Sequence, residues 1–193
     1  MLARQCELAP DAEAILCGER RFSYRELDAA SSRLAANLAR HGLGVGDTAL
    51  VQLPNVAEFY LVFFALLKAG IAPVNALFSH NRLELLSYAE QITPRLFIGS
   101  LAHPLFASKG RESEMLTTIG AELVLLDGDA GELGLTRWLT KGAENFGVKI
   151  ASKRDFDSGR VQHASTRNRK RRLQQLEWER WLAEQPESSN AGM

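Results

Sequence analysis

The chain has 193 residues, of which 46% are hydrophobic and 24% charged, and its 23 basic side chains balance its 23 acidic ones. This composition is typical of a globular protein and excludes a disordered, collagen-like or low-complexity chain. No run reaches the about 18 apolar residues that a membrane-spanning helix needs. The two cysteines, Cys6 and Cys17, have neither metal-ligand spacing nor a disulfide framework. We therefore expect a cytoplasmic protein without a membrane segment.

The zero net charge conceals two segments of opposite charge. Residues 1–147 carry 13 basic and 17 acidic side chains, a net charge of −4. Residues 148–193 carry 10 basic and 6 acidic side chains, a net charge of +4, and are poorer in apolar residues. This asymmetry predicts two units, of which only the first can bury a core.

The first predicted elements are a small hairpin and an amphipathic helix. An apolar run from Ala14 to Cys17, a charged turn and Phe22 predict two short paired strands. Ser23-Tyr24-Arg25-Glu26 has the pattern of a capping box, so a helix should begin there. Gly42 lies where a left-handed residue would end that helix. Apolar residues recur at spacings of three and four and form one stripe: Leu27, Ala30, Leu34 and Leu38.

A strand, a buried helix and a second strand are expected next. The first strand covers residues 48–53, and Asn55 is the expected N-cap of the helix that follows. Residues 56–69 are apolar on most sides, which predicts a buried helix that stops at Gly70. The next strand covers residues 71–76, and Pro73 within it favours a position at the edge of a sheet.

The same alternation continues to residue 126. We expect a helix over residues 81–91, with Leu83, Leu86 and Ile92 facing inward, and a short strand over residues 96–98. Residues 109–119 are a candidate helix, and residues 122–126 a candidate strand. Repeated strand–helix alternation with short connections predicts an α/β fold with a mostly parallel sheet and flanking helices.

Glycine patterns that bind phosphate are missing from the sequence. Neither G-x-x-x-x-G-K-[ST] nor G-x-G-x-x-G occurs. The glycines of Gly42-Leu43-Gly44-Val45-Gly46 precede a predicted strand, whereas a phosphate loop follows a strand and leads into a helix. We interpret this segment as a helix end followed by a turn.

Other residues with catalytic chemistry form no recognisable group. The histidines have no metal-ligand spacing: His41, His80, His103 and His163. His80 follows a strand, where α/β sheets bind ligands, but we favour a turn or helix start. Asp127 and Asp129 are candidates for a carboxylate pair, but we favour a solvated turn. We therefore assign no catalytic, cofactor-binding or metal-binding residue in this chain.

Two segments resemble core motifs of the adenylate-forming enzymes. Arg21-Phe22-Ser23-Tyr24-Arg25-Glu26-Leu27 resembles the TYxEL element, and Leu66-Leu67-Lys68-Ala69-Gly70-Ile71-Ala72-Pro73-Val74 resembles the LKAGxAYVP element. Residues 51–55, 58–59 and 76–85 resemble the aryl-acid branch, in particular the 2,3-dihydroxybenzoate–AMP ligases of siderophore biosynthesis. The resemblance runs from about residue 5 to about residue 146, and it places Met1 inside an early helix of the family.

The resemblance implies an ATP-dependent acid–AMP ligase that is incomplete in this chain. The full family uses ATP and Mg²⁺ to convert an aryl carboxylate to an acyl-adenylate, and then loads a carrier-protein thiol. The family's phosphate loop, S-G-G-T-T-G-T-P-K, would follow the matched segment, but no Gly-Gly or Thr-Thr-Gly occurs after Gly147. The C-terminal domain with the catalytic lysine is also missing. We therefore expect residues 1–147 to be a partial N-terminal subdomain, inactive alone and without a cofactor site.

The partners implied by the resemblance follow from this incompleteness. The missing C-terminal part of the ligase is the expected partner, and an aryl carrier protein would be a partner only of the complete enzyme. One half of a split ligase is thus an alternative function for this chain.

Residues 148–193 do not resemble the family and form a basic tail. A run from Arg167 to Arg172 precedes apolar residues at roughly helical spacing: Leu173, Leu176, Trp181 and Leu182. We favour an unrelated, poorly ordered or helical segment joined by a frameshift or truncation. The alternatives are an arginine-rich helix that binds nucleic acid, and a basic amphipathic helix for an acidic partner or a membrane surface. A non-enzymatic binding module that uses this tail is therefore a second alternative function.

Overall fold

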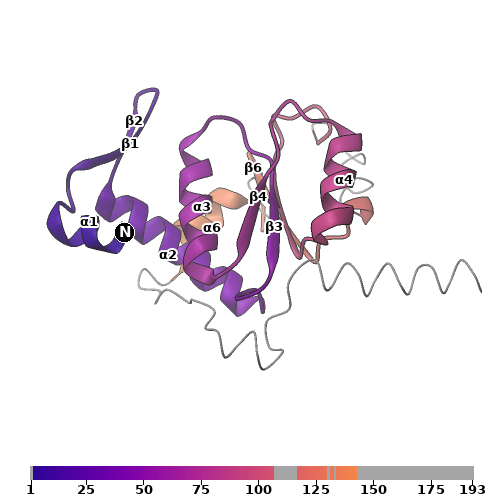
Figure 1. Cartoon of the computed structure of the whole chain (residues 1–193). Coiled ribbons are helices and arrows are strands. Elements are labelled where there is room, and N and C mark those ends of the chain that lie inside the picture. Colours follow the sequence, from indigo (N-terminus) through magenta and orange to yellow (C-terminus); the bar gives the residue numbers. More distant parts are fainter. Residues whose placement is uncertain (1, 107–116, 130, 133, 143–193) are drawn as a thin grey trace, which may run out of the picture.

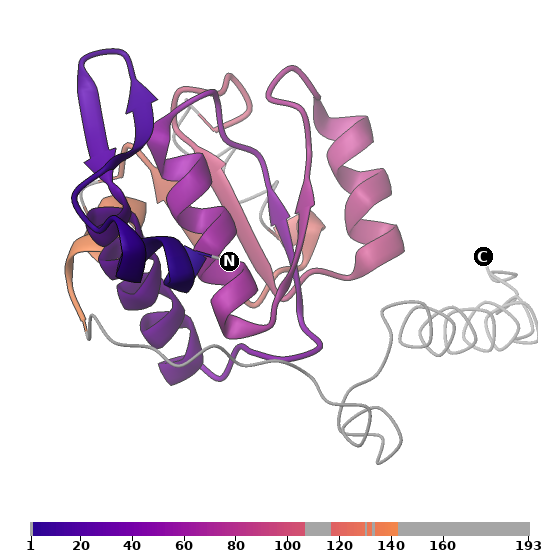
Figure 2. The ribbon, with the colours of Figure 1, turned by 60° about the vertical axis from the view of Figure 1, so that its left-hand side comes forward.

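The computed structural model describes residues 2–106, 117–129, 131–132 and 134–142. A short helix, α1 (Leu2–Leu8), precedes an antiparallel hairpin of β1 (Glu13–Cys17) and β2 (Arg20–Ser23). The hairpin stands beside the main sheet as a separate two-stranded unit (Figures 1 and 2). The predicted hairpin is confirmed.

Helix α2 (Tyr24–Arg40) begins and ends as its sequence predicts. The Ser23 hydroxyl accepts from the Glu26 backbone N–H, and the Glu26 carboxylate accepts from the Ser23 backbone N–H, at 3.3 and 2.8 Å. Gly42 has a φ of +75°, and the Leu43 and Gly42 amides donate to the carbonyls of Leu38 and Ala39. This pair of bonds is a Schellman motif, which satisfies the last carbonyls of the helix.

The main sheet has four parallel strands, β3 (Thr48–Val51), β4 (Ala72–Asn75), β5 (Leu96–Ser100) and β6 (Leu123–Asp127). They lie in the order β4-β3-β5-β6. Helix α3 (Ala57–Ala69) connects β3 to β4, α4 (Arg82–Ile92) connects β4 to β5, and α6 (Leu135–Thr140) follows β6. The parallel α/β fold is confirmed, and Pro73 lies on an edge strand as expected.

Both faces of the sheet are covered by helices (Figure 1). Alternate residues of β3 separate two cores, because Ala49 and Val51 pack with α2, α3 and α6 while Leu50 packs with α4. Strands β3 and β5 are buried along their whole length, which explains why they read as continuous apolar runs instead of alternating ones. No helix in the described ranges is long and apolar enough to cross a membrane.

Two local predictions are wrong. The N-cap of α3 is Val56, not Asn55, and no side chain caps that end. Leu83 is 80% exposed, because the buried side of α4 is formed by Leu85 and Ala89, whereas Ile92 packs against the same core as predicted. The predicted helix at 109–119 lies largely outside the described residues, although 117–119 are helical. Helix α6 was not among the predicted elements.

Candidate functional site

The carboxyl ends of the strands are where an open parallel sheet binds ligands. The connection after β3 leads to one side of the sheet and the connection after β5 to the other, so a topological switch point lies between these two neighbours. Four polar side chains lie at the ends of the strands or shortly after them: Gln52, Ser100, His103 and Asp127. We call these four residues the carboxyl edge and treat it as the candidate site.

Gln52 fixes the loop between β4 and α4. Its side chain is fully buried, and its Nε2 donates to the carbonyl oxygens of Leu77 and His80 at 3.1 and 2.8 Å. These two acceptors determine the orientation of the amide, because the flipped form would face two carbonyls with its own oxygen. Its Oε1 is a buried oxygen without a partner among the residues that the structure describes. The role of the Gln52 side chain is therefore to hold the loop between β4 and α4 in place.

His103 holds the same loop from the strand β5 side. It is 3% exposed, its Nδ1 accepts from the Leu105 amide at 3.2 Å, and its ring meets Phe78 edge-on at 5.1 Å between centroids. Burial lowers the pKa of His103, and backbone contacts with Phe78 and His80 oppose this shift. The ring is thus neutral, with the proton assigned to Nε2 from its hydrogen bonds. His103 is buried against backbone groups and the ring of Phe78, and we interpret it as a packing residue.

Asp127 differs from its prediction as a solvated carboxylate. Gly128 does make the expected turn, with a φ of +87°, but Asp127 is half-buried and its Oδ2 accepts from the Ser100 hydroxyl at 3.4 Å. Burial raises the pKa of Asp127, and the negative charge of Glu58 adds to the effect. Asp129 instead accepts from the Gly131 amide at 2.9 Å. Asp127 and Asp129 therefore have different partners.

The remaining histidines that the sequence singled out have structural surroundings. His80 lies in the turn before α4 and stacks on Tyr88 at 5.7 Å between ring centroids, which confirms the turn interpretation. His41 lies at the end of α2 and packs against Trp138 at 4.6 Å. His163 and the basic tail lie outside the described residues.

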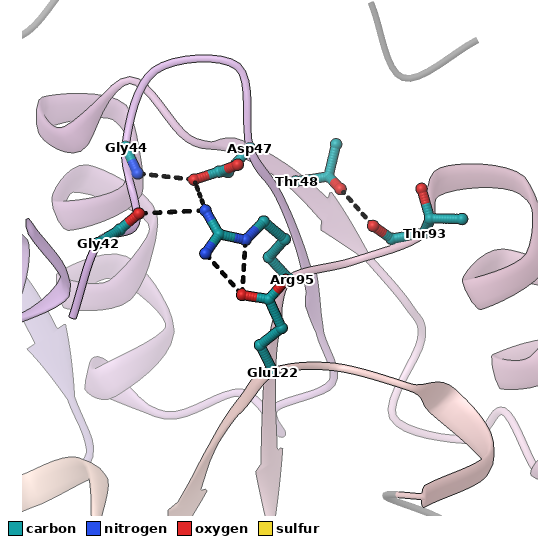
Figure 3. A network of polar contacts seen from close by, with 7 residues as sticks. All are labelled: Gly42, Gly44, Asp47, Thr48, Thr93, Arg95 and Glu122. Atoms are coloured by element: carbon teal, nitrogen blue, oxygen red, sulfur yellow. Dashed lines mark hydrogen bonds and ion pairs between the residues drawn. The ribbon is translucent and has the colours of Figure 1, made fainter. Parts of the chain in front are cut away.

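At the opposite edge of the sheet, where the strands begin, Arg95 holds together the segments that lead into the strands (Figure 3). Its guanidinium donates to Glu122 at 2.6 and 2.8 Å, to Asp47 at 3.0 Å and to the Gly42 carbonyl at 3.1 Å. These bonds join the segments before β3, β5 and β6. They also raise the pKa of Arg95, with the Glu122 hydrogen bond as the largest cause. The glycine segment 42–46 is thus a helix end and a structural turn, as predicted.

A pocket of about 350 Å³ lies between the ends of α2 and α6. Its basic lining comes from Arg40, Arg137 and Lys141. Basic residues at helix C-termini are favoured by the helix dipole without any ligand, and Arg40 already donates to Asn37 at 2.9 Å. The pocket therefore carries no functional assignment.

The described residues do not fit ATP phosphates or Mg²⁺. The described ranges contain no group of three or more His, Cys, Asp or Glu side chains that could hold a metal ion. The connection from β3 into α3 contains Pro54 and Asn55 but no glycine, so it cannot form the glycine-rich cradle of a phosphate loop. Chemically, Gln52 and His103 position the loop after β4, and the hydroxyl–carboxylate contact of the carboxyl edge, from Ser100 to Asp127, is long at 3.4 Å.

Comparison with known proteins gives strong matches along most of the chain. Residues 2–158 match the family described as AMP-binding enzyme. The chain is 66% identical over 106 residues to pseudomonine synthase PmsE of Pseudomonas entomophila, covering 55% of this chain and 17% of that protein. It is 48% identical over 139 residues to enterobactin synthase component E of Escherichia coli, covering 72% and 26%. It is 46% identical over 80 residues to the 2,3-dihydroxybenzoate-AMP ligase of Bacillus subtilis, covering 42% and 15%.

Solved structures confirm the fold. The apo structure of MbtA from Mycobacterium smegmatis superposes with a TM-score of 0.65 at 32% identity, covering 78% of this chain and 28% of that one. The chain thus spans about a quarter or less of the length of the relatives it matches. The family match also extends past Gly147, and the predicted division at that residue stays a prediction.

The resemblance seen in the two core motifs is therefore confirmed by sequence and by structure. Both motifs are structural in this chain, since the first is the capped start of α2 and the second is the joint from α3 to β4. Together with a match that covers most of the chain, they show that this chain belongs to the AMP-binding enzyme family.

Proposed function

We propose that this chain is the N-terminal unit of an aryl-acid adenylate-forming ligase and has no ligase activity by itself. The observation that carries the proposal is a match to this family over residues 2–158 whose described part holds structural motifs but no phosphate or metal site. The unit's role is to supply the four-stranded sheet and its helices to a larger enzyme. The split-ligase alternative is the same role, with the rest of the enzyme on a separate polypeptide.

The substrate class follows from the relatives. One of them is named for 2,3-dihydroxybenzoate, and two others are named as synthases of pseudomonine and enterobactin. We infer that the complete ligase activates an aryl carboxylate of this kind with ATP and Mg²⁺ and transfers the acyl group to a carrier-protein thiol. The groups that would bind ATP and stabilise the transition state lie elsewhere in such an enzyme.

The tail does not change this proposal. The family match ends at residue 158, and we infer that the part of residues 148–193 beyond it is a basic segment unrelated to the ligase chemistry. The use of this tail on nucleic acid stays the less favoured alternative. Cys6 and Cys17 are both free thiols, which supports a reducing, cytoplasmic location.

ATP–pyrophosphate exchange tests the proposal. The purified 193-residue chain is incubated with ATP, Mg²⁺, labelled pyrophosphate and 2,3-dihydroxybenzoate, beside the Bacillus subtilis ligase as a positive control. We expect exchange from the control and none above blank from the chain. Exchange by the chain that depends on the aryl acid would refute the claim that the unit is inactive alone.

A further inference from the structure

Helix α3 buries its charged residues and exposes apolar ones. Its only charged residues, Glu58 and Lys68, are 8% and 7% exposed and face other elements of the fold. Glu58 accepts two hydrogen bonds from Arg20 of the hairpin at 2.6 and 3.2 Å. Lys68 is bonded to Asp28 on α2 at 2.8 Å. A surface helix normally carries its charged residues on the side that faces water, but those of α3 make ion pairs with other parts of the unit.

The solvent side of α3 is apolar instead. Tyr60, Phe63 and Leu67 follow one another at spacings of three and four, which places them on one side of the helix. Tyr60 is 51% exposed, Leu67 is 45% exposed and Phe63 is half-buried. The opposite side of the same helix packs into the core through Leu61, Ala65 and Leu66. We call Tyr60, Phe63 and Leu67 the outer face of α3.

A helix that is apolar all round is normally buried on all sides in a larger protein. In α3 the inner side is already covered, because it packs on α2 and on the sheet. The outer face carries no charged side chain, so it offers nothing to a nucleic acid or to an acidic partner. It fits an equally uncharged, apolar protein surface.

We propose that the outer face of α3 is the docking surface for the ligase polypeptide that the relatives carry beyond the matched stretch. The proposal rests on the proposed function, since it concerns the same incomplete ligase unit. The occupant is chosen from the lengths, because the matched stretch is only 15–26% of these relatives and the rest of each is available to cover it. Docking in trans would be the step by which this unit joins a complete enzyme.

Binding in trans tests the docking surface without using activity. The full chain is mixed with the Bacillus subtilis ligase from which the stretch matched by this chain has been deleted, and affinity is measured by fluorescence anisotropy on the labelled chain. The test variant carries Tyr60→Lys and Leu67→Lys. The matched control is Leu83→Lys, on an 80% exposed leucine of α4, which covers the other face of the sheet. Circular dichroism and thermal melting are recorded for each chain.

We expect saturable binding by the unaltered chain and by the Leu83→Lys control, and at least tenfold weaker binding by the double variant with an unchanged melting temperature. Three results would overturn the proposal. The first is no binding by the unaltered chain. The second is equal binding by the double variant. The third is evidence that something else covers the outer face of α3. A concentration-dependent dimer that the double variant abolishes would identify a second copy of this chain, and a large loss of thermal stability in the monomeric double variant would identify another part of the same chain.

These outcomes are separable from the proposed function. A chimera in which this chain replaces the matched stretch of the relative can be active even if the outer face of α3 plays no part in docking. Conversely, trans binding that depends on Tyr60 and Leu67 can occur without any exchange activity. The chimera's activity therefore tests the ligase assignment, and the double variant tests the surface.

Discussion

Lys68 is buried between α2 and α3, and its replacement by methionine should strongly destabilise the unit. The side chain is 9% exposed, and its Nζ donates to the Asp28 carbonyl, the Asp28 carboxylate and the Ser32 hydroxyl, each at 2.8 Å. All three ammonium protons are therefore used. Lys68→Met keeps the aliphatic stem in place and removes the three bonds and the charge.

The expected loss in the free energy of unfolding depends on how deeply the partners of Lys68 are buried. Removing one member of a buried ion pair costs about 3–5 kcal/mol, because the other charge is left uncompensated. Asp28 keeps 32% of its side-chain surface exposed and can regain water, whereas Ser32 is 2% exposed and cannot. We therefore expect Lys68→Met to lower the free energy of unfolding by about 2–3 kcal/mol. This value lies between the loss expected for an exposed ion pair and that for a fully buried one.

Urea unfolding followed by far-ultraviolet circular dichroism measures this loss. The matched control is Arg21→Met, which removes the ion pair of Arg21 with Glu13 on the hairpin, where the two side chains are 68% and 43% exposed. The control should change the free energy by less than about 0.5 kcal/mol, because exposed pairs contribute little. Equal stability of Lys68→Met and the unaltered chain would refute the reasoning about the α2–α3 contact.

Three further predictions concern a helix end and two titrating groups. Gly70 ends α3 with a φ of +75°, so Gly70→Ala should cost about 1 kcal/mol in urea unfolding, while Gly44→Ala, at a glycine without positive φ, should be neutral. Backbone and hydroxyl bonds from Ser23 lower the pKa of Glu26, so the stability they give is present above its unfolded value of about 4.3 and is lost as pH falls through the lower folded pKa. Urea midpoints between pH 6 and 3 should therefore fall less in Glu26→Gln, and an identical fall would contradict this linkage. Burial lowers the pKa of His103, so the unfolded chain binds a proton that the folded chain does not, and stability should fall as pH drops below about 6.5. Midpoints for His103→Gln between pH 7.5 and 5.5 should lack that component.

Local chemistry explains why much of the fold is readable from the sequence. The capping box at Ser23 and the glycine at position 42 specify the ends of α2 through bonds made within a few residues. The edge position of β4 follows from Pro73, which cannot donate to a neighbouring strand. Predictions of this kind succeed because the determining interaction is contained in the segment itself.

The errors at α4 and α6 arise where contacts with a distant element decide the structure. Leu83 fits a helical stripe, but the sheet contacts α4 through Leu85 instead, and Leu83 is left in solvent. Helix α6 is short and is held by α2, because Asn37 donates to the carbonyls of Trp138 and Lys141 at 3.0 and 2.7 Å. Those contacts join residues about a hundred positions apart, and no local pattern signals them.

Two of the four carboxyl-edge residues, His103 and Asp127, are singled out from the sequence, but their surroundings cannot be read from it. The partly buried state of Asp127 depends on Ser100, from the neighbouring strand, and on Glu58, from α3. Gln52 and His103 hold the loop after β4 from two other loops, and a glutamine after a strand gives no signal of that role. The resemblance to a family added what residue spacing could not, namely the larger enzyme to which such a unit belongs.

The most direct test of the central claim is the activity of a chimera. The stretch of the Bacillus subtilis 2,3-dihydroxybenzoate-AMP ligase that this chain matches is replaced with the corresponding residues of this chain, and ATP–pyrophosphate exchange is measured with 2,3-dihydroxybenzoate. If this chain is the N-terminal unit of an aryl-acid ligase, the chimera should catalyse exchange within about tenfold of the parent, a difference of about 1.4 kcal/mol in the barrier. A folded chimera that binds ATP and shows no exchange would contradict the account.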